Sequence, residues 1–364
     1  MVNWKNTIRL ICSIAIISAC NNSDSKKNKE IESSAENDGA FSSLVNKREI
    51  QGYTQGSTFV VKTSDDSLLT STYELESLFT GFDAELSGYM NESLISKVNE
   101  SKDGVNLPNN TYFSNCFQRS MEIFDLTNGA FDPSVFPLVK AWGFFKDSTL
   151  MLTQHQVDSC LQFISFENGK NFIFSKDSLV KKDKRFEFDF NAIAQGLSVD
   201  VVAKYLDNKG QKNYFIEIGG EVYAKGINPE GNAWVVGIDN PEESNTGMGN
   251  RSLENTVSLK NKALATSGNY RKFYVMDGRK FSHTIDPKTG YSVKHNLLSA
   301  TVLANDCASA DAFATSFMVM GKDSTLNFIT HHPELELEVY LLFENEEGRI
   351  ERAYTSGMTT LIQQ

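Results

Sequence analysis

Three short polar clusters near the C-terminal end of the chain contain the residue types that metal-assisted chemistry needs. They are residues 265–270 (ATSGNY), 283–290 (HTIDPKTG) and 310–315 (ADAFAT). Each lies in apolar, β-prone sequence, which predicts several strand ends and one helix start converging on a single site. On that helix Asp311 and Thr315 are four residues apart, so their hard oxygen atoms share one face. The pattern favours a metal-assisted enzyme that acts on a phosphorylated ligand.

The neighbours of Asp311 distinguish it from an ordinary surface aspartate. An Asp/Thr pair at this spacing often lies on a solvated helix face, and that alternative applies here too. However, Ala310, Ala312 and Phe313 flank Asp311, which predicts that this part of the helix is buried. A buried carboxylate needs a cation or hydrogen-bond donors. Asp306, ahead of the helix, is expected to cap it.

His283 stands out among the five histidines because it precedes the tight turn I-D-P-x-T-G. A functional histidine and a hydrogen-bonded structural histidine both fit this position, and the residues alone leave the choice open. The other four lie in polar, loop-like sequence and are expected at the surface: His155, His295, His331 and His332.

Two further segments contain residues suited to ligand binding. Gly219-Gly220-Glu221 follows an apolar strand-like run; the glycines would let backbone approach a ligand, and the glutamate could accept from ribose or base donors. A hairpin turn or bulge is the alternative, and Thr266-Ser267-Gly268 is also common in turns. No G-x-G-x-x-G follows a strand, and the P-loop, H-E-x-x-H and G-x-S-x-G motifs are absent. A Rossmann or P-loop nucleotide site is therefore not expected.

The overall charge argues against a nucleic-acid partner. The 364 residues carry 35 Lys and Arg against 46 Asp and Glu, a formal net charge of −11. Without Lys5 and Arg9 of the N-terminal segment, the net charge is near −13. Such a surface repels nucleic acid and anionic membranes.

The N-terminus reads as a targeting segment followed by a tether. Residues 1–19 combine a short basic region with an apolar run too short to span a bilayer. The run ends in I-S-A-C, which resembles a bacterial lipobox with Cys20 as the lipidated residue. An ordinary signal peptide with an incidental cysteine is the alternative. Residues 21–47 are polar and predict a disordered tether, so we expect an exported lipoprotein, anchored in the inner or outer membrane, facing the periplasm, with a folded domain over 48–364.

The remaining cysteines, Cys116, Cys160 and Cys307, have no spacing suited to zinc. Cys116 and Cys160 could pair in an oxidising compartment, but buried thiols are equally consistent with the sequence.

Periodicity predicts the elements that must position these clusters. Helices are expected over 71–86, 111–126, 134–142, 192–206 and 307–320, with Gly210 and Gly321 as stops. Strands are expected over 56–62, 214–218, 233–238, 256–259, 273–276 and 298–303. The pattern predicts one α+β body with mostly antiparallel strands and helices packed outside, and it leaves a division into two lobes open.

Taken together, the segments resemble the ApbE family of FAD:protein FMN transferases, whose order of motifs is followed over about 235 residues. The matching segments are Ser87-Gly88-Tyr89 with Ser93 and Asn99; residues 129–135 (GAFDPSV) with Leu138 and Trp142-Gly143-Phe144; residues 189–196 (DFNAIAQG) with Asp200; Gly219-Gly220-Glu221; and the three C-terminal clusters. The resemblance implies a single ApbE-like body, related to the T-fold. Where many members have lysine, this chain has Gln195, which keeps a hydrogen-bonding group but loses a charge.

The resemblance also implies an activity and site residues. Such enzymes use Mg²⁺ and FAD as substrate, transfer FMN to a Ser or Thr hydroxyl through a phosphoester, and release AMP. By analogy, Asp311, Thr315 and the Ala194 carbonyl bind the metal. FAD would be contacted by Tyr89, Asp189, Gly220, Glu221, Thr266, Ser267, Gly268, His283 and Ile285. His283 or Asp286 would accept the hydroxyl proton, and the choice is open.

Partners and competing functions follow from the same resemblance. Flavin acceptors of the family are membrane-associated electron-transfer proteins with a D-x-x-[ST]-G-A-[ST]-like segment, which this chain lacks. An FAD pyrophosphatase releasing FMN and AMP would use the same site. A non-catalytic FAD-binding lipoprotein and a surface adhesion module are further alternatives.

Overall fold

A computed structural model describes residues 48–107, 112–144, 151–241, 252–269, 273–276 and 279–363. The expected signal segment, Cys20 and tether lie outside the described residues. The strands are β1 (Glu49–Thr54), β2 (Ser57–Thr63), β3 (Gly104–Asn106), β4 (Phe172–Ser175), β5 (Ser178–Lys181), β6 (Tyr214–Ile218), β7 (Glu221–Lys225), β8 (Trp234–Asp239), β9 (Leu253–Leu259), β10 (Lys262–Gly268), β11 (Phe273–Met276), β12 (Arg279–Ser282), β13 (Leu297–Ala304), β14 (Glu338–Glu344), β15 (Ile350–Tyr354) and β16 (Ile362–Gln363). The helices are α1 (Thr72–Leu86), α2 (Leu94–Glu100), α3 (Tyr112–Leu126), α4 (Phe136–Ala141), α5 (Gln154–Leu161), α6 (Ala194–Asn208), α7 (Cys307–Met320), α8 (Lys322–His331) and α9 (Ser356–Leu361), with 3₁₀ turns η1 (Pro133–Val135) and η2 (Pro333–Leu335).

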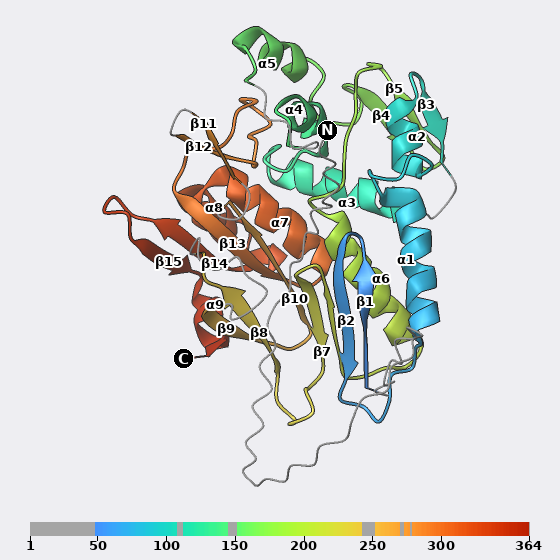
Figure 1. Cartoon of the computed structure of the whole chain (residues 1–364), viewed down its shortest axis with the longest axis vertical. Helices are drawn as coiled ribbons and strands as arrows, with labels where there is room; N and C mark the ends of the chain where they lie inside the picture. The colour runs from blue at the N-terminus through green and yellow to red at the C-terminus, as the bar shows by residue number, and fades with distance from the viewer. Residues whose placement is uncertain are drawn as a thin grey trace, which may run out of the picture.

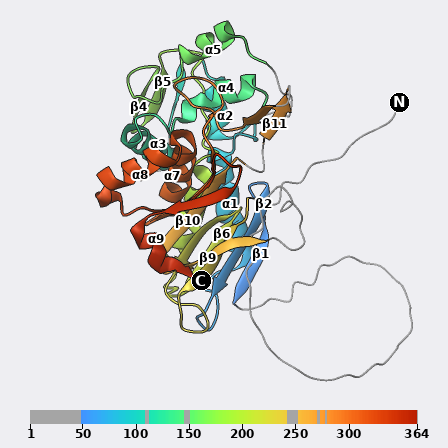
Figure 2. The same cartoon turned by 90° about the vertical axis from the view of Figure 1, so that its left-hand side faces the viewer.

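The centre of the fold is an eight-stranded sheet of order β1-β2-β6-β7-β10-β13-β14-β15. Its neighbouring strands pair antiparallel, which confirms the predicted α+β class. Helices α2, α4 and α5 and the small β3-β5-β4 sheet lie toward one end of the molecule, and β8, β9 and α9 lie toward the other (Figures 1 and 2). The division into two lobes stays a prediction.

The two faces of the large sheet bury different sets of side chains. The main core joins the sheet to α1, α3, α6 and α7 and includes Ala263 and Ala265 of β10. A second cluster, with Leu264 of the same strand, lies under β8 and β9. This alternation follows the two-residue period of a strand. It decides which residues of β10 face α7.

Helix α7 forms where its sequence predicts. The Asp306 side chain accepts from the Ser309 amide and caps the helix, and Gly321 ends it with φ = 78°. Its bounds confirm the expected helix over 307–320. Nearly every α7 side chain before Val319 is buried, so hydrophobic burial against the sheet and α6 stabilises it more than helix propensity does.

The three cysteines within the described residues form no disulfide. Cys116, Cys160 and Cys307 are free thiols, with Cys116 and Cys307 buried, so the structure does not pair Cys116 with Cys160.

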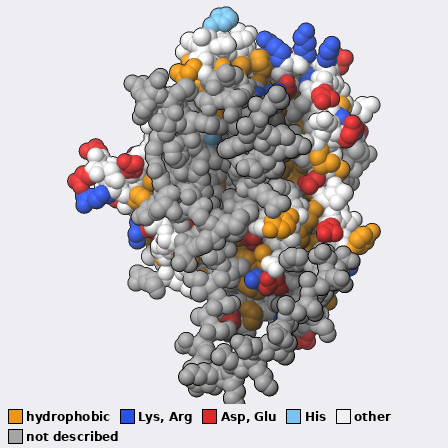
Figure 3. Space-filling model, in the orientation of Figure 1, with side chains coloured by type: hydrophobic (Ala, Val, Ile, Leu, Met, Phe, Trp, Pro, Cys, Tyr) orange, Lys and Arg blue, Asp and Glu red, His pale blue; other side chains and the backbone are white. Residues whose placement is uncertain are grey.

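Within the described ranges, none of the helices is both long and apolar enough to cross a bilayer. The face seen in Figure 3 carries acidic and basic side chains together along its rim.

Candidate active site

Asp311 lies on the buried face of α7 and points at the start of α6. It is 6% exposed, and its Oδ2 accepts a hydrogen bond from the Gly196 amide at 3.1 Å. Burial raises the pKa of this carboxyl to about 7, because the charged form loses its hydration. One amide donor replaces little of that hydration, so the position favours a cation next to Asp311.

The two helices approach backbone to backbone at Gly196. A Cβ atom on Gly196 would lie 2.3 Å from the Cys307 carbonyl oxygen and 2.9 Å from the Asp311 Cβ. A larger residue would therefore push α6 and α7 apart. Ala194 is the first residue of α6, so its backbone lies at the same helix contact.

Thr315 and Ser267 join α7 to the end of β10. Thr315 is half-buried one turn beyond Asp311, and its Oγ1 is 3.0 Å from the Ser267 Oγ. Thr266 differs from Ser267: its Oγ1 is 2.8 Å from Thr301 Oγ1 on β13. Alternation along β10 turns the Thr266 side chain toward the sheet face opposite α7. The structure thus brings Ser267, and not the Thr266 side chain, to Thr315.

Gly219 and Gly220 form the two-residue turn between β6 and β7, with φ of 64° and 112°. The hairpin alternative is therefore confirmed, and positive φ at both positions explains the glycines. A Cβ on Gly219 would lie 1.9 Å from Gln195 Nε2, whereas one on Gly220 would meet nothing within 4 Å. The Gln195 amide covers one side of the turn, and the Gly220 side stays open. Glu221 begins β7 beside it.

The Gly220 backbone amide is already engaged. It donates to Oε1 of the buried Glu217 at 2.8 Å. The turn therefore offers a ligand open space next to Gly220, but the Gly220 amide itself already has a partner.

Asp189 and Tyr89 lie together ahead of α6. Burial raises the pKa of Asp189 to about 6, although its carboxylate accepts from the Asn191 amide at 3.0 Å. Tyr89 is 73% exposed, but burial of its hydroxyl end and the Asp189 charge raise its pKa. The Asp189 amide donates to the Pro133 carbonyl, so the G-x-F-D-P segment holds this pair. An exposed ring with an anchored hydroxyl can stack on a planar ligand.

The His283–Gly290 segment is a tight turn on a different part of the structure. His283 is half-buried and follows β12. Thr284 Oγ1 donates to Asn269 Oδ1 at 2.7 Å, and Asn269 directly follows Gly268 of β10. The Trp142 indole donates to the Gly290 carbonyl at 2.9 Å. The turn is therefore tied to the end of β10 and to the segment that holds Asp189.

Within this turn, two of the predicted site residues have structural roles. The Asp286 Oδ1 accepts from the Lys288 amide at 2.9 Å, so this carboxylate caps its own turn. The Ile285 side chain is buried in a small cluster with Leu138 and Trp142, so only its backbone is placed to meet a ligand.

Several structural contributors were not identified from the sequence. The contacts of Gly196 with α7 and of Gln195 with Gly219 join residues far apart in the chain. The hydrogen bond from the Gly220 amide to Glu217 depends on the geometry of the turn. His295, expected at the surface, is half-buried, and its Nε2 is 2.9 Å from the Met318 carbonyl at the end of α7. Burial lowers its pKa.

The donor set fits Mg²⁺. The Asp311 carboxylate, Thr315 hydroxyl and Ala194 carbonyl are hard oxygens, the type that Mg²⁺ prefers. Among residues that the structure describes, no three His, Cys, Asp or Glu side chains are grouped to hold a metal ion. A cation here would keep coordination positions for water or phosphate, as Mg²⁺ does when few carboxylates hold it.

Comparisons with known proteins show which family the chain is similar to. The profile of the ApbE family matches residues 55–340. The FAD:protein FMN transferase of Haemophilus influenzae is 33% identical over 318 residues, covering 84% of this chain and 88% of that protein. The flavin transferase ApbE from Vibrio cholerae has a TM-score of 0.75 at 27% identity, covering 86% of this chain and 98% of that one. The apo flavinyl transferase ApbE of Pseudomonas stutzeri has a TM-score of 0.74 at 25% identity, over 86% and 96%.

Proposed function

Because this chain belongs to the ApbE family, we propose that it transfers the FMN moiety of FAD to a Ser or Thr hydroxyl of a target protein. The products are a phosphoester-linked flavin and AMP. The observation that carries the proposal is the buried Asp311, placed one turn from Thr315 and against the start of α6. A buried carboxylate beside a second hard oxygen donor is suited to a divalent cation that meets phosphate.

Asp311, Thr315 and the Ala194 carbonyl would hold the metal. When bound, Mg²⁺ neutralises charge on the pyrophosphate. The chain itself keeps the carboxylate oriented, since the Gly196 amide fixes Oδ2. The Ser267 hydroxyl orients Thr315.

The flavin and adenosine are held on either side of this centre. Tyr89, with its hydroxyl end anchored near Asp189, offers its exposed ring to the flavin. The open face of Gly220 and the adjacent Glu221 are suited to the adenosine and phosphates. Gln195 contributes a neutral amide there, so the metal supplies most of the positive charge.

We propose His283 as the proton acceptor. The acceptor hydroxyl oxygen attacks the FMN phosphorus, the bond to the bridging oxygen breaks, and AMP leaves with that oxygen. The proton of the hydroxyl must go to a base. Histidine is the side chain that most often serves as a general base, which favours His283 over Asp286.

The test combines residues 48–364 of the chain with FAD, Mg²⁺ and an acceptor domain that contains a D-x-x-[ST]-G-A-[ST] segment. Intact-mass spectrometry of the acceptor is carried out with and without a chelator. We expect one FMN per acceptor, AMP in equal amount, and no adduct with the chelator. Free FMN and AMP with an unmodified acceptor would identify an FAD pyrophosphatase instead. Unchanged FAD that stays bound would identify a binding protein.

We also propose that the enzyme is an exported lipoprotein, anchored through Cys20 and facing the periplasm, with membrane-associated electron-transfer proteins as acceptors. The support is the basic and apolar run that ends in I-S-A-C. Replacement of Cys20 with Ala should move the protein from the membrane to the soluble fraction while leaving catalysis in solution unchanged. Continued membrane association would contradict the anchor.

A further inference from the structure

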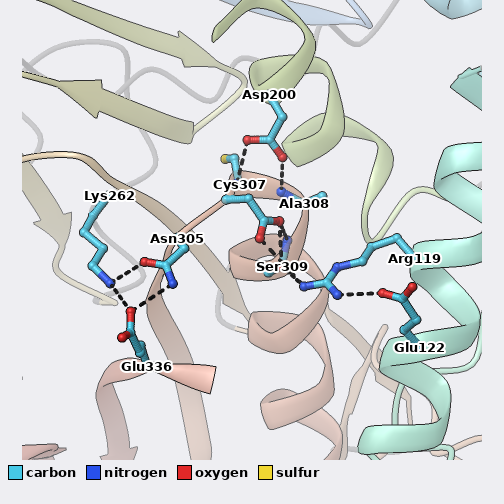
Figure 4. Close-up of polar contacts among 10 residues, drawn as sticks. Arg119, Glu122, Asp200, Lys262, Asn305, Cys307, Ala308, Ser309 and Glu336 are labelled. Carbon is cyan, nitrogen blue, oxygen red and sulfur yellow. Dashed lines mark hydrogen bonds and ion pairs between the residues drawn. The ribbon is translucent and has the colours of Figure 1, made fainter. Parts of the chain in front are cut away.

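The N-terminal end of α7 is held by a carboxylate from another helix. The Asp200 side chain, on α6, accepts from the Cys307 amide through Oδ1 and from the Ala308 amide through Oδ2, both at 2.8 Å. Figure 4 shows it reaching from α6 to the first turn of α7. These are amides that have no partner within their own helix. A single half-buried side chain thus satisfies two of them from outside.

The same pair of helices is joined again one turn later. Gly196 lies one α6 turn before Asp200, and Asp311 lies one α7 turn after Cys307; the Gly196 amide bonds the Asp311 carboxylate. The absence of a side chain at Gly196 allows this contact. These hydrogen bonds, one turn apart on each helix, fix the register of α7 along α6.

Asp306 caps the same helix end differently. Its Oδ1 accepts from the Ser309 amide at 2.8 Å, and its Oδ2 is 3.7 Å from Arg119 of α3. Arg119 also donates to Ser309 Oγ and pairs with Glu122 (Figure 4). These contacts join α7 to α3 and not to α6. Asp200 therefore acts on the α6–α7 register, whereas Asp306 acts on helix capping and on the contact of α7 with α3.

We propose that Asp200 is a positioning residue of the metal site: it sets the register of α7 on α6 and so places the Asp311 carboxylate opposite the start of α6. The proposal rests on the metal role assigned to Asp311 above. A residue that orients a metal ligand typically changes metal affinity 10- to 100-fold when it is altered.

The experiment measures Mn²⁺ binding to the flavin-free chain. Asp200→Asn leaves one acceptor and places an amino group against an amide donor; Asp200→Glu keeps the charge and both acceptors but adds one methylene. We expect both variants to raise the Mn²⁺ Kd about tenfold. Asp306→Ala removes a nearby charge and the cap of the same helix, and its Kd should stay within about twofold while its Tm falls. Hydrogen exchange of the peptide containing Gly196 should accelerate only in the Asp200 variants.

Each other outcome overturns the inference. An unchanged Mn²⁺ Kd in Asp200→Glu would show that Asp200 acts through its charge and not through the helix register. Equal changes of Kd in the Asp200 and Asp306 variants would show that Asp200 acts only as a helix cap. If Asp200→Asn does not fold, Asp200→Glu decides the question with the same criteria. Absence of Mn²⁺ binding by the wild type would refute the metal site itself, a result distinct from the others.

Discussion

The α6–α7 contact and the His283–Gly290 turn form two parts of one candidate site, and they are built in different ways. At the α6–α7 contact, the groups are buried and the bonds join residues more than one hundred positions apart, such as Gly196 with Asp311. In the turn, most bonds are local, as between Asp286 and Lys288, and His283 is only half-buried.

The α6–α7 contact must be rigid to hold a metal, whereas the His283–Gly290 turn must be accessible to the acceptor protein. A metal ligand needs a fixed position before the ligand arrives. A proton acceptor for a protein substrate needs access to a surface, and loops supply that. The comparison therefore predicts that changes in the first part alter metal binding, and that changes in the turn alter transfer while metal binding is kept.

The largest effect is expected for Asp311→Ala. It removes the only side-chain carboxylate assigned to the metal, so FMN transfer should fall to background and added Mg²⁺ should not restore it. Initial rates over a range of Mg²⁺ concentrations give the result. Substantial turnover at high Mg²⁺ would place the metal elsewhere.

His283→Ala should slow transfer about 10²-fold or more, the usual contribution of a general base. Rates with the acceptor at pH 7 provide the measurement, and the Mn²⁺ Kd should match the wild type. Lys288→Ala is the control, because the exposed Lys288 contributes only its backbone amide to the turn. Equal losses in the two variants would assign His283 to the folding of the turn.

Gly196→Ala should weaken metal binding and lower stability by about 1–3 kcal/mol, since the new Cβ overlaps the Cys307 carbonyl. Gly81→Ala is a matched control within α1, where the added Cβ meets only Tyr112 at 3.9 Å. That change should be neutral or stabilise by up to about 1 kcal/mol. Denaturant unfolding of both variants would show the contrast, and a Gly196→Ala variant as stable as Gly81→Ala would contradict the close contact.

The smallest effect concerns pH. Burial, assisted by the Asp306 charge and opposed by the Cys307 and Ala308 amides and by Arg119, raises the pKa of Asp200 to about 7. Between the ordinary carboxyl pKa of about 4 and pH 7, the folded protein keeps this proton and the unfolded chain does not. This group therefore lowers the free energy of unfolding as the pH rises from about 4 to about 7.

Asp200→Asn should make that decline shallower without removing it, because burial also raises the pKa of Asp132, Asp189 and Asp311. Denaturant unfolding in a chelator at several pH values from 5 to 8 provides the comparison. An identical slope in the variant would show that Asp200 titrates in its ordinary range.

The sequence predicted those parts of the fold that local patterns determine. The bounds of α7 and β6 match the expected ranges, and α1 begins one residue after the expected start and ends where expected. The three- and four-residue strands β3, β4 and β5 were not predicted, because such short runs show no clear period. The pairing of β10 with β13 explains why Thr266 turns away from α7, and pairing cannot be inferred from one strand alone.

The candidate site was predicted as a set of residue types, but not as a set of contacts. Asp311 and Thr315 share a face as their spacing implies. The contact of Gly196 with α7 depends on two helices meeting at a distance of 115 residues in sequence. Cys116 and Cys160, which the sequence allowed to pair, are free.

Mn²⁺ titration of the flavin-free wild type, Asp311→Ala and His283→Ala, measured side by side, tests the division of the site most directly. We expect the wild type and His283→Ala to bind Mn²⁺ with the same Kd and Asp311→Ala not to bind it. If His283→Ala lost affinity as Asp311→Ala does, or if Asp311→Ala bound normally, the separation of a metal-holding part from an acceptor-facing part would be wrong.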